Sequence, residues 1–210
     1  MMYRIRYIAT TPFSFRKEQA TTKFSATYPC PTPYAAKVAL TVGAIRAGVS
    51  PDDFVKKLSK TQVQPHPWGE GVINTHMVKH YEVPRSDGGG GHLPKGYFSP
   101  TVVFREFLYF DGGVDLYVQE DAFDWLKPAL PGVNCFGKQG SFFSLLSVDE
   151  SDIPSGGIAF QGSDFRKNAT WAKVSNFSGQ TSKPREDASF KVTMRIAGGG
   201  QNFVHLKFGA

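Results

Sequence analysis

The sequence predicts an α+β protein built on a ferredoxin-like core, followed by a C-terminal extension of antiparallel strands. Two observations predict this fold class. Segments patterned as a strand, a helix, a strand, a hairpin, a helix and a strand follow one another in that order, as in a split βαβ core. The 210 residues are also 40% hydrophobic and 20% charged, so the chain can bury one sizeable core. We expect the core in residues 1–150 and the extension in residues 151–210.

The first strand is predicted over Met2–Ala9, where large hydrophobic and basic side chains alternate. Because side chains alternate between the two faces of a strand, Tyr3, Ile5 and Tyr7 are expected to share one face. Residues 10–27 are rich in Thr, Ser and Phe, and we expect an extended, exposed connection there. This connection carries three cations: Arg16, Lys17 and Lys23.

The first helix is predicted to begin after Thr32, which is suited to be its N-cap, with Pro33 in its first position. Gly48 is placed to end it. Small residues, including Gly43, would allow close packing against a neighbouring element. Four larger side chains are expected on its buried face: Val38, Leu40, Val42 and Ile45.

A second helix is expected to follow Ser50, whose neighbours Asp52 and Asp53 resemble a capping box, and to end near Lys60. Four consecutive glycines within residues 84–96 predict a flexible loop, because ordering glycine is entropically costly. The other expected elements are strands over 72–83 and 100–110, a tight turn at Asp111-Gly112-Gly113 into a strand over 114–119, a helix over 122–130 interrupted by Pro128, a strand over 141–148, and strands over 169–177, 188–196 and 202–208.

The net charge of +6 conceals an uneven distribution. Residues 1–60 carry a net charge of +7, residues 61–110 are neutral, residues 111–164 carry −7 and residues 165–210 carry +6. Two basic ends on one face would suit a polyanion, while the acidic stretch would suit a protein neighbour. An ordinary basic surface explains the same total equally well.

Several classes of protein are disfavoured by what the sequence lacks. No hydrophobic run approaches the about 20 residues that a membrane-spanning helix needs, and the first residues do not read as a signal peptide. Cys30 and Cys135 fit no metal-ligand spacing and no disulfide framework. We therefore expect a cytoplasmic protein without a metal, a cofactor or a membrane partner.

Three motifs, in this order, resemble the fifth CRISPR-associated (Cas) family of the RAMP superfamily: Tyr28-Pro-Cys-Pro-Thr-Pro-Tyr-Ala-Ala-Lys37, Phe104-Arg-Glu-Phe-Leu-Tyr-Phe-Asp111 and Phe136-Gly-Lys-Gln-Gly-Ser141. The resemblance covers residues 1 to about 148. It implies an RRM-like, ferredoxin-like palm with an inserted thumb at about residues 62–99. In that family the subunit holds the 5′ handle of crRNA and caps one end of a type I Cascade complex.

The resemblance also implies partners and an activity. The partners are the crRNA 5′ handle, the Cascade backbone subunit, the large subunit and, indirectly, target DNA, all in antiviral defence. Activity in the family is usually RNA binding without catalysis and without a cofactor. One branch, of subtype I-C, instead cuts precursor crRNA as a metal-independent endoribonuclease, and this is the alternative function for the present chain.

The candidate RNA-binding residues begin with the cations of the first basic block. Arg16, Lys17, Lys23 and Lys37 could follow an RNA backbone, the last of these near a helix N-terminus that favours phosphate. Tyr28 and Tyr34 could stack on unpaired bases, although packing within the palm is at least as good an explanation.

Four histidines, His66, His76, His80 and His92, lie within 27 residues of one another. A zinc site is weakly supported, because no pair has tight ligand spacing. In the enzymatic alternative, Tyr34, Lys79 and His80 would supply acid–base chemistry. RNA or subunit contact by the thumb is the interpretation that we favour, and it involves His80, Arg85, His92 and Lys95.

The remaining candidates lie in the second and third motifs. Arg105 alternates with Glu106 on its strand and could reach the RNA, or it could form an ordinary surface ion pair. Lys138 and Gln139 lie between two glycines, where backbone N–H groups can approach phosphate. This segment lacks the spacing of a P-loop, so nucleotide hydrolysis is excluded. His205 and Lys207 follow a short glycine run that would serve either an RNA contact or a hairpin turn.

Overall fold

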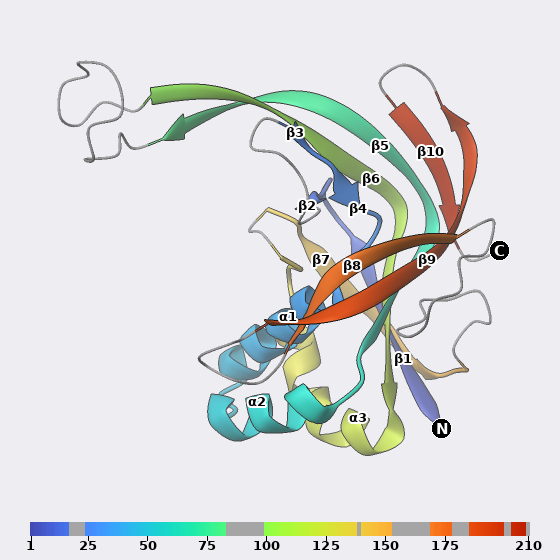
Figure 1. Ribbon diagram of the computed structural model, residues 1–210. Coiled ribbons are helices and arrows are strands. Elements are labelled where there is room, and N and C mark those ends of the chain that lie inside the picture. Colours follow the sequence, from blue (N-terminus) through green and yellow to red (C-terminus); the bar gives the residue numbers. More distant parts are fainter. Residues whose placement is uncertain are drawn as a thin grey trace.

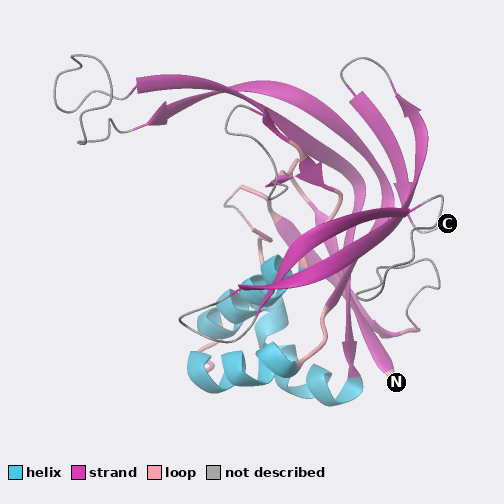
Figure 2. Ribbon diagram, in the orientation of Figure 1, coloured by secondary structure: helices cyan, strands magenta, loops and turns pink. Residues whose placement is uncertain are grey.

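The fold was analysed in a computed structural model of the chain. It describes residues 1–16, 24–82, 99–137, 140–152, 169–177, 185–199 and 203–208. Strands dominate, and the helices gather on one side of the molecule (Figure 2). In chain order the elements are β1 (Met2–Ala9), β2 (Phe15–Arg16), β3 (Phe24–Ser25), β4 (Thr27–Tyr28), α1 (Pro33–Arg46), α2 (Pro51–Lys60), β5 (Gln64–Glu82), β6 (Ser99–Gln119), α3 (Glu120–Leu126), the 3-10 helix η1 (Lys127–Gly132), β7 (Phe143–Glu150), β8 (Ala169–Phe177), β9 (Arg185–Gly199) and β10 (Phe203–Phe208).

The central sheet has the strand order β7-β1-β6-β5, and each neighbouring pair is antiparallel. With α1 and α2 between β1 and β5, and α3 between β6 and β7, this is a ferredoxin-like palm. The predicted α+β fold class is thus confirmed. The C-terminal strands continue the same sheet in the order β10-β9-β8, because β10 pairs with β5. They are antiparallel to one another, as predicted.

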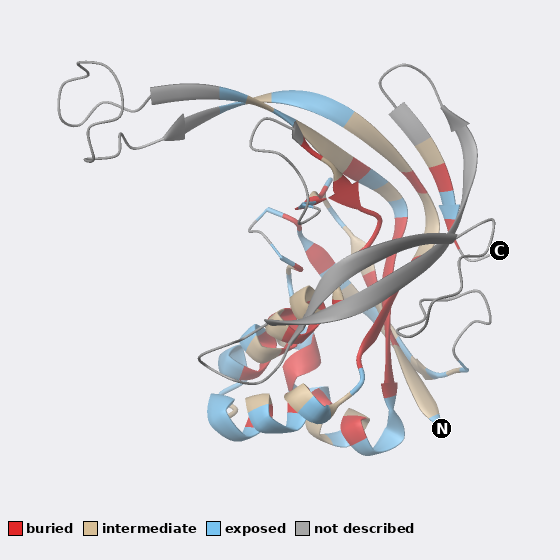
Figure 3. Ribbon diagram, viewed as in Figure 1, coloured by how far each residue is buried: buried red, intermediate tan, exposed pale blue. Residues whose placement is uncertain are grey.

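The sheet curls toward the helices, so that β8, at one edge, lies beside α1 (Figure 1). The core lies between the palm strands and the helices (Figure 3). From β1, Ile5 and Tyr7 are fully buried, as their alternation predicts. The hydroxyl of Tyr7 donates a hydrogen bond to the carbonyl of Leu130 in η1, at 3.1 Å, which satisfies a buried polar group.

Helix α1 begins and ends where the sequence predicts. The hydroxyl of Thr32 accepts a hydrogen bond from the N–H of Ala35 at 3.2 Å, and Gly48 takes a φ of 75° after the last turn. Its buried face was predicted correctly for Leu40, which is fully buried, and incorrectly for Val42 and Ile45, which are exposed. The small residues instead pack against η1, so closely that a Cβ on Gly43 would lie 2.3 Å from the Ala129 carbonyl.

Helix α2 spans the predicted residues, but the expected cap is absent, since the side chain of Ser50 makes no capping hydrogen bond. Helix α3 gives way to η1 one residue before Pro128, as the predicted interruption requires. The predicted exposed connection over residues 10–27 is wrong for Phe13 and Phe15. Both rings are buried, and Phe13 lies 4.6 Å from Phe15 between ring centroids.

The predicted tight turn at residues 111–113 does not exist. β6 runs without a break through Asp111, Gly112 and Gly113, and it pairs with β5 from residue 99 to residue 117. Gly112 lies opposite Gly69, and both have positive φ, 146° and 81°. A Cβ on Gly112 would lie 2.2 Å from the Trp68 carbonyl. The glycines therefore permit close backbone approach within two continuous strands rather than a reversal of the chain.

β5 and β6 continue beyond the palm as a long curved ribbon that leads away from the helices (Figure 1). The last residue of β5 that pairs with β10 is Asn74, whereas pairing with β6 continues to Glu82 and Ser99. We call residues 75–82 and 99–106 the distal ribbon. β3 pairs in parallel with β6 at Phe104 and Arg105, near the base of this ribbon.

Candidate nucleic-acid interface

The face of the sheet opposite the helices carries polar and aromatic side chains from β5, β6 and β10. Leu108 and Val114 of β6 point into the core, so the residues alternating with them belong to the opposite face. On that face the register places Tyr109 opposite Val72, and Val72 opposite His205. Three adjacent strands therefore contribute side chains to one continuous surface.

His76, Phe107 and Tyr109 form a cluster of rings on this face. The hydroxyl of Tyr109 lies 3.1 Å from Nε2 of His76. The His76 ring meets Phe107 edge-on, with ring centroids 5.6 Å apart at 78°. Both His76 and Tyr109 are exposed, Tyr109 by 40%. Arg105 lies directly across from His76 in the register, so its side chain leaves the same face of the ribbon as these rings.

Toward the palm, the same face carries an ion-pair group around Glu70. Its carboxylate is 2.9 Å from Nε2 of His205 and is paired with Nζ of Lys207. The hydrogen bond from Lys207 is the main reason that the pKa of Glu70 lies below its ordinary value. Two of the basic residues that the sequence singled out near the C-terminus thus share one acidic partner.

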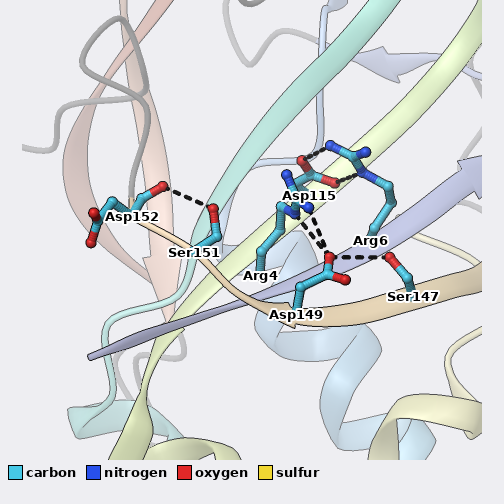
Figure 4. A network of polar contacts seen from close by, with 7 residues as sticks. All are labelled: Arg4, Arg6, Asp115, Ser147, Asp149, Ser151 and Asp152. Carbon is cyan, nitrogen blue, oxygen red and sulfur yellow. Dashed lines mark hydrogen bonds and ion pairs between the residues drawn. The ribbon is translucent and has the colours of Figure 1, made fainter.

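A second polar network joins β1 to its neighbours β6 and β7 (Figure 4). Arg4 donates from Nε and Nη2 to Oδ2 of Asp149, at 3.1 and 2.8 Å. Arg6 donates from Nε and Nη2 to the two oxygens of Asp115, at 2.8 and 2.7 Å. Bidentate pairs of this kind fix geometry as well as adding energy. Both arginines are therefore occupied by carboxylates within the chain.

Two aromatic contacts lie beside this network. The guanidinium carbon of Arg6 is 4.5 Å from the centroid of the Trp68 ring, a cation–π contact. His66 meets Tyr117 edge-on with ring centroids 5.0 Å apart. Burial lowers the pKa of His66 to about 4, so this histidine is neutral at physiological pH.

The predicted RNA-binding residues divide into those that the structure describes and those that it does not. Arg16 is exposed in β2, and Arg105 is partly buried in β6. His80 belongs to β5, where only its backbone is described. Seven predicted residues lie outside the described residues: Lys17, Lys23, Arg85, His92, Lys95, Lys138 and Gln139.

Tyr28 and Lys37 lie in the palm interior, which is the packing alternative for Tyr28 and differs from the surface position expected for Lys37. Tyr28 is 5% exposed and belongs to the core cluster. Lys37 is 3% exposed, and its ammonium donates to the carbonyl of Ser59, near the end of α2, at 3.4 Å. Because α1 packs beside α2, the ammonium of Lys37 lies at the C-terminus of α2. Its charge therefore stabilises that helix end rather than facing solvent.

The residues of the enzymatic alternative come from separate elements. Tyr34 is partly buried in the first turn of α1, whereas Lys79 is exposed in β5. Lys79 lies opposite Val102 in the register, on the ribbon face that also carries Met77 and Phe104. His76, by contrast, belongs to the other ribbon face.

Phe107 and Tyr109 were not among the residues that sequence reasoning selected. The signal was present, because Arg105, Phe107 and Tyr109 are spaced by two within a predicted strand, which puts them on one face. Their contact with His76 could not be read from the sequence, since it depends on the register of β5 against β6.

Within the described ranges, no group of three or more His, Cys, Asp and Glu side chains is arranged to hold a metal ion. Cys30 is buried and Cys135 partly buried, and both are free thiols. None of the helices in the described part of the chain is both long enough and apolar enough to cross a membrane.

Comparison with known proteins gives structural matches only. No protein-family model matches the sequence, and no curated protein sequence matches it. The chain is similar to a solved chain titled "CRISPR RNA-guided surveillance complex", with a TM-score of 0.53 and 15% identity over 90% of this chain and 87% of that chain.

Two further structures are similar at lower TM-scores. One is a CRISPR protein from Archaeoglobus fulgidus, with a TM-score of 0.43 and 11% identity over 100% of this chain and 93% of that one. The other is a chain of the Type III-B Cmr-beta complex bound to cognate target RNA and AMPPnP. Its TM-score is 0.42, with 11% identity over 96% of this chain and 86% of that chain. The match with the TM-score of 0.53 shows that the present chain shares its fold with a chain of the surveillance complex.

Proposed function

We propose that this protein is a RAMP-superfamily subunit of a type I Cascade complex, which clamps the 5′ handle of crRNA and caps one end of the complex in antiviral defence. The observation that carries the proposal is the fold shared with a chain of a CRISPR RNA-guided surveillance complex over 90% of the present chain. The three sequence motifs that resemble the fifth Cas family, within residues 28–141, also support it. Its partners would be crRNA, the backbone subunit and the large subunit, with target DNA reached indirectly.

In this proposal the distal ribbon is the thumb. β5 continues for eight residues past Asn74, from Thr75 to Glu82, which corresponds to about 26 Å of strand. A two-stranded ribbon of this length leaves backbone and side chains accessible on both of its faces. It could therefore contact RNA on one face and a neighbouring subunit on the other.

Two described cations would hold the RNA backbone. Arg16 is exposed in β2, which pairs with β4, and Arg105 lies in β6 opposite His76. Each such contact would add affinity and salt dependence, with little sequence information. The further proposed contacts are Lys17, Lys23, Tyr34, His80, Arg85, His92, Lys95, Lys138 and Gln139.

The proposal is tested by measuring binding of a crRNA handle oligonucleotide by fluorescence anisotropy, with scrambled RNA and DNA of equal length as competitors. We expect preferential binding of the handle and a loss of at least tenfold in affinity for a double Arg16→Glu, Arg105→Glu variant. Lys57→Glu is the matched control, because Lys57 is exposed on α2, at the helical side of the palm. Equal affinity for handle and scrambled RNA would contradict the proposal.

The same RNA distinguishes binding from cleavage. Precursor crRNA is incubated with the purified protein in EDTA and analysed on a denaturing gel. We expect intact RNA. Cleavage at the handle boundary that is lost in Tyr34→Phe, Lys79→Ala or His80→Ala would instead establish the metal-independent endoribonuclease.

A further inference from the structure

The ring cluster on the sheet face opposite the helices is built as an exposed, oriented surface rather than as part of the core. Tyr109 exposes 40% of its surface, and His76 is also exposed. The 3.1 Å contact between the Tyr109 hydroxyl and Nε2 of His76 joins β6 to β5. It holds two rings on adjacent strands with ring centroids 6.0 Å apart, so little conformational entropy remains to be lost when a flat ligand binds.

A cationic side chain lies beside these rings at their distal end, where Arg105 faces His76 in the register. The described acidic side chains nearest to the rings on this face, Glu70 and Asp111, lie together at its palm end. There, Lys207 and His205 are both engaged by the Glu70 carboxylate. Arg105 is therefore the cation of this face that is suited to bind a phosphate next to the rings.

The opposite face of the same ribbon has a different chemistry. Met77 is 70% exposed, and Phe104 and Val102 are exposed beside it. The carboxylate of Glu106, also on that face, accepts a hydrogen bond from the backbone N–H of Thr27 at 2.8 Å. This face also carries Lys79, but no ring contact joins Phe104 to another described aromatic side chain there, so the two faces differ in the number of rings that they group together.

We propose that His76, Phe107 and Tyr109 form a platform on which unpaired RNA bases stack, with Arg105 contacting the adjoining phosphate. This rests on the proposed function for the identity of the nucleic acid, and it deepens that function by assigning the site that holds single-stranded bases. Unpaired bases present flat faces that stack on aromatic rings and on His and Arg side chains. The platform makes binding tolerant of base identity, because every base has such a face.

Handle RNA carrying 2-aminopurine at successive positions tests the platform, with affinity and fluorescence measured together. Tyr109→Ala is expected to weaken binding by about 5- to 100-fold and to abolish the quenching of at least one 2-aminopurine. Tyr109→Phe keeps a ring and is expected to stay within about threefold of wild type. Phe104→Ala is the matched control, an exposed aromatic residue on the opposite face of the ribbon, and it should leave both readouts unchanged.

Salt dependence separates stacking from charge. Tyr109→Ala removes no charge, so the slope of log affinity against log salt should stay that of wild type. Arg105→Gln should reduce its magnitude by about 0.7. Thermal unfolding of each variant shows whether it is folded, and Tyr109→Phe remains informative if Tyr109→Ala is not.

The outcomes distinguish this inference from the proposed function. If wild type binds handle RNA but Tyr109→Ala and Phe104→Ala bind equally well, the platform is wrong and the handle-binding function stands. If wild type prefers no handle sequence yet loses single-stranded RNA binding on Tyr109→Ala, the platform stands and the handle-binding function is wrong. If no RNA binds, both are wrong.

Discussion

Arg6 of β1 donates two hydrogen bonds to Asp115 of β6, and the aspartate side chain is only 4% exposed. The guanidinium, 25% exposed, also lies over the Trp68 ring. Hydrogen bonding to Asp115 raises the pKa of Arg6, so the guanidinium stays charged throughout the physiological range. This relationship ties the first strand of the palm to the strand that carries the proposed RNA-binding surface.

Replacing Asp115 with asparagine should destabilise the protein. The change leaves a partly buried guanidinium without its counter-ion, and we expect a loss of about 2–3 kcal/mol in the free energy of unfolding, somewhat below the value for a fully buried pair. Urea unfolding followed by circular dichroism measures it. Asp149→Asn is the matched control, since its pair with Arg4 is more exposed and should contribute less than about 1 kcal/mol. Equal losses would contradict this account.

Removing the charge of Lys37 and removing the charge of Arg16 should have different effects on RNA affinity. Lys37→Met is expected to leave RNA affinity unchanged, because its ammonium is buried against the Ser59 carbonyl. Arg16→Met removes an exposed charge and should lower affinity and reduce the salt slope by about 0.7. Anisotropy titrations at several salt concentrations measure both. A weaker salt slope in folded Lys37→Met would show that the lysine reaches RNA after all.

Local chemistry was sufficient to predict the boundaries of α1 and the first strand. Thr32, Pro33 and Gly48 each act on backbone within a few residues of themselves, so their effect is independent of the rest of the fold. The alternation over Met2–Ala9 predicts its buried face for the same reason. The order of such elements was enough for the ferredoxin-like palm.

Features that depend on distant contacts were predicted poorly. Gly112 has the same local preference in a tight turn as in a strand that passes close to another backbone, and only the presence of Gly69 opposite decides between them. From its local sequence Lys37 is expected to be a surface cation, and only its contact with the Ser59 carbonyl of α2 shows that it is buried. His76 and Tyr109 are separated by 33 positions, so their contact follows from the β5–β6 register alone.

A Cβ at Gly112 should be poorly tolerated. In Gly112→Ala the new atom would lie 2.2 Å from the Trp68 carbonyl, within two paired strands that have no room to move apart. We expect a loss of more than about 2 kcal/mol or a failure to fold. Gly48→Ala is the control, since it shares a positive φ but meets nothing within 4 Å, and should cost only about 1 kcal/mol. Thermal unfolding compares the two, and similar melting temperatures would contradict the close approach.

His66 should make folding sensitive to mild acid. Burial lowers its pKa from 6.5 to about 4, so between these values the unfolded chain binds a proton that the folded chain does not. Stability is therefore complete above about pH 6.5 and falls as the pH approaches 4, by at most about 3 kcal/mol.

The measurement is urea unfolding at intervals from pH 7.5 to 4.5 for wild type and His66→Gln, which cannot be protonated. We expect wild type to lose stability steadily below pH 6.5 and the variant to show a flatter profile. Asp149→Asn is the control, because hydrogen bonding to Arg4 lowers the pKa of Asp149 below its ordinary 3.8 and places its titration below this range. If wild type and His66→Gln lose stability in parallel, the acid sensitivity arises from groups other than the buried histidine.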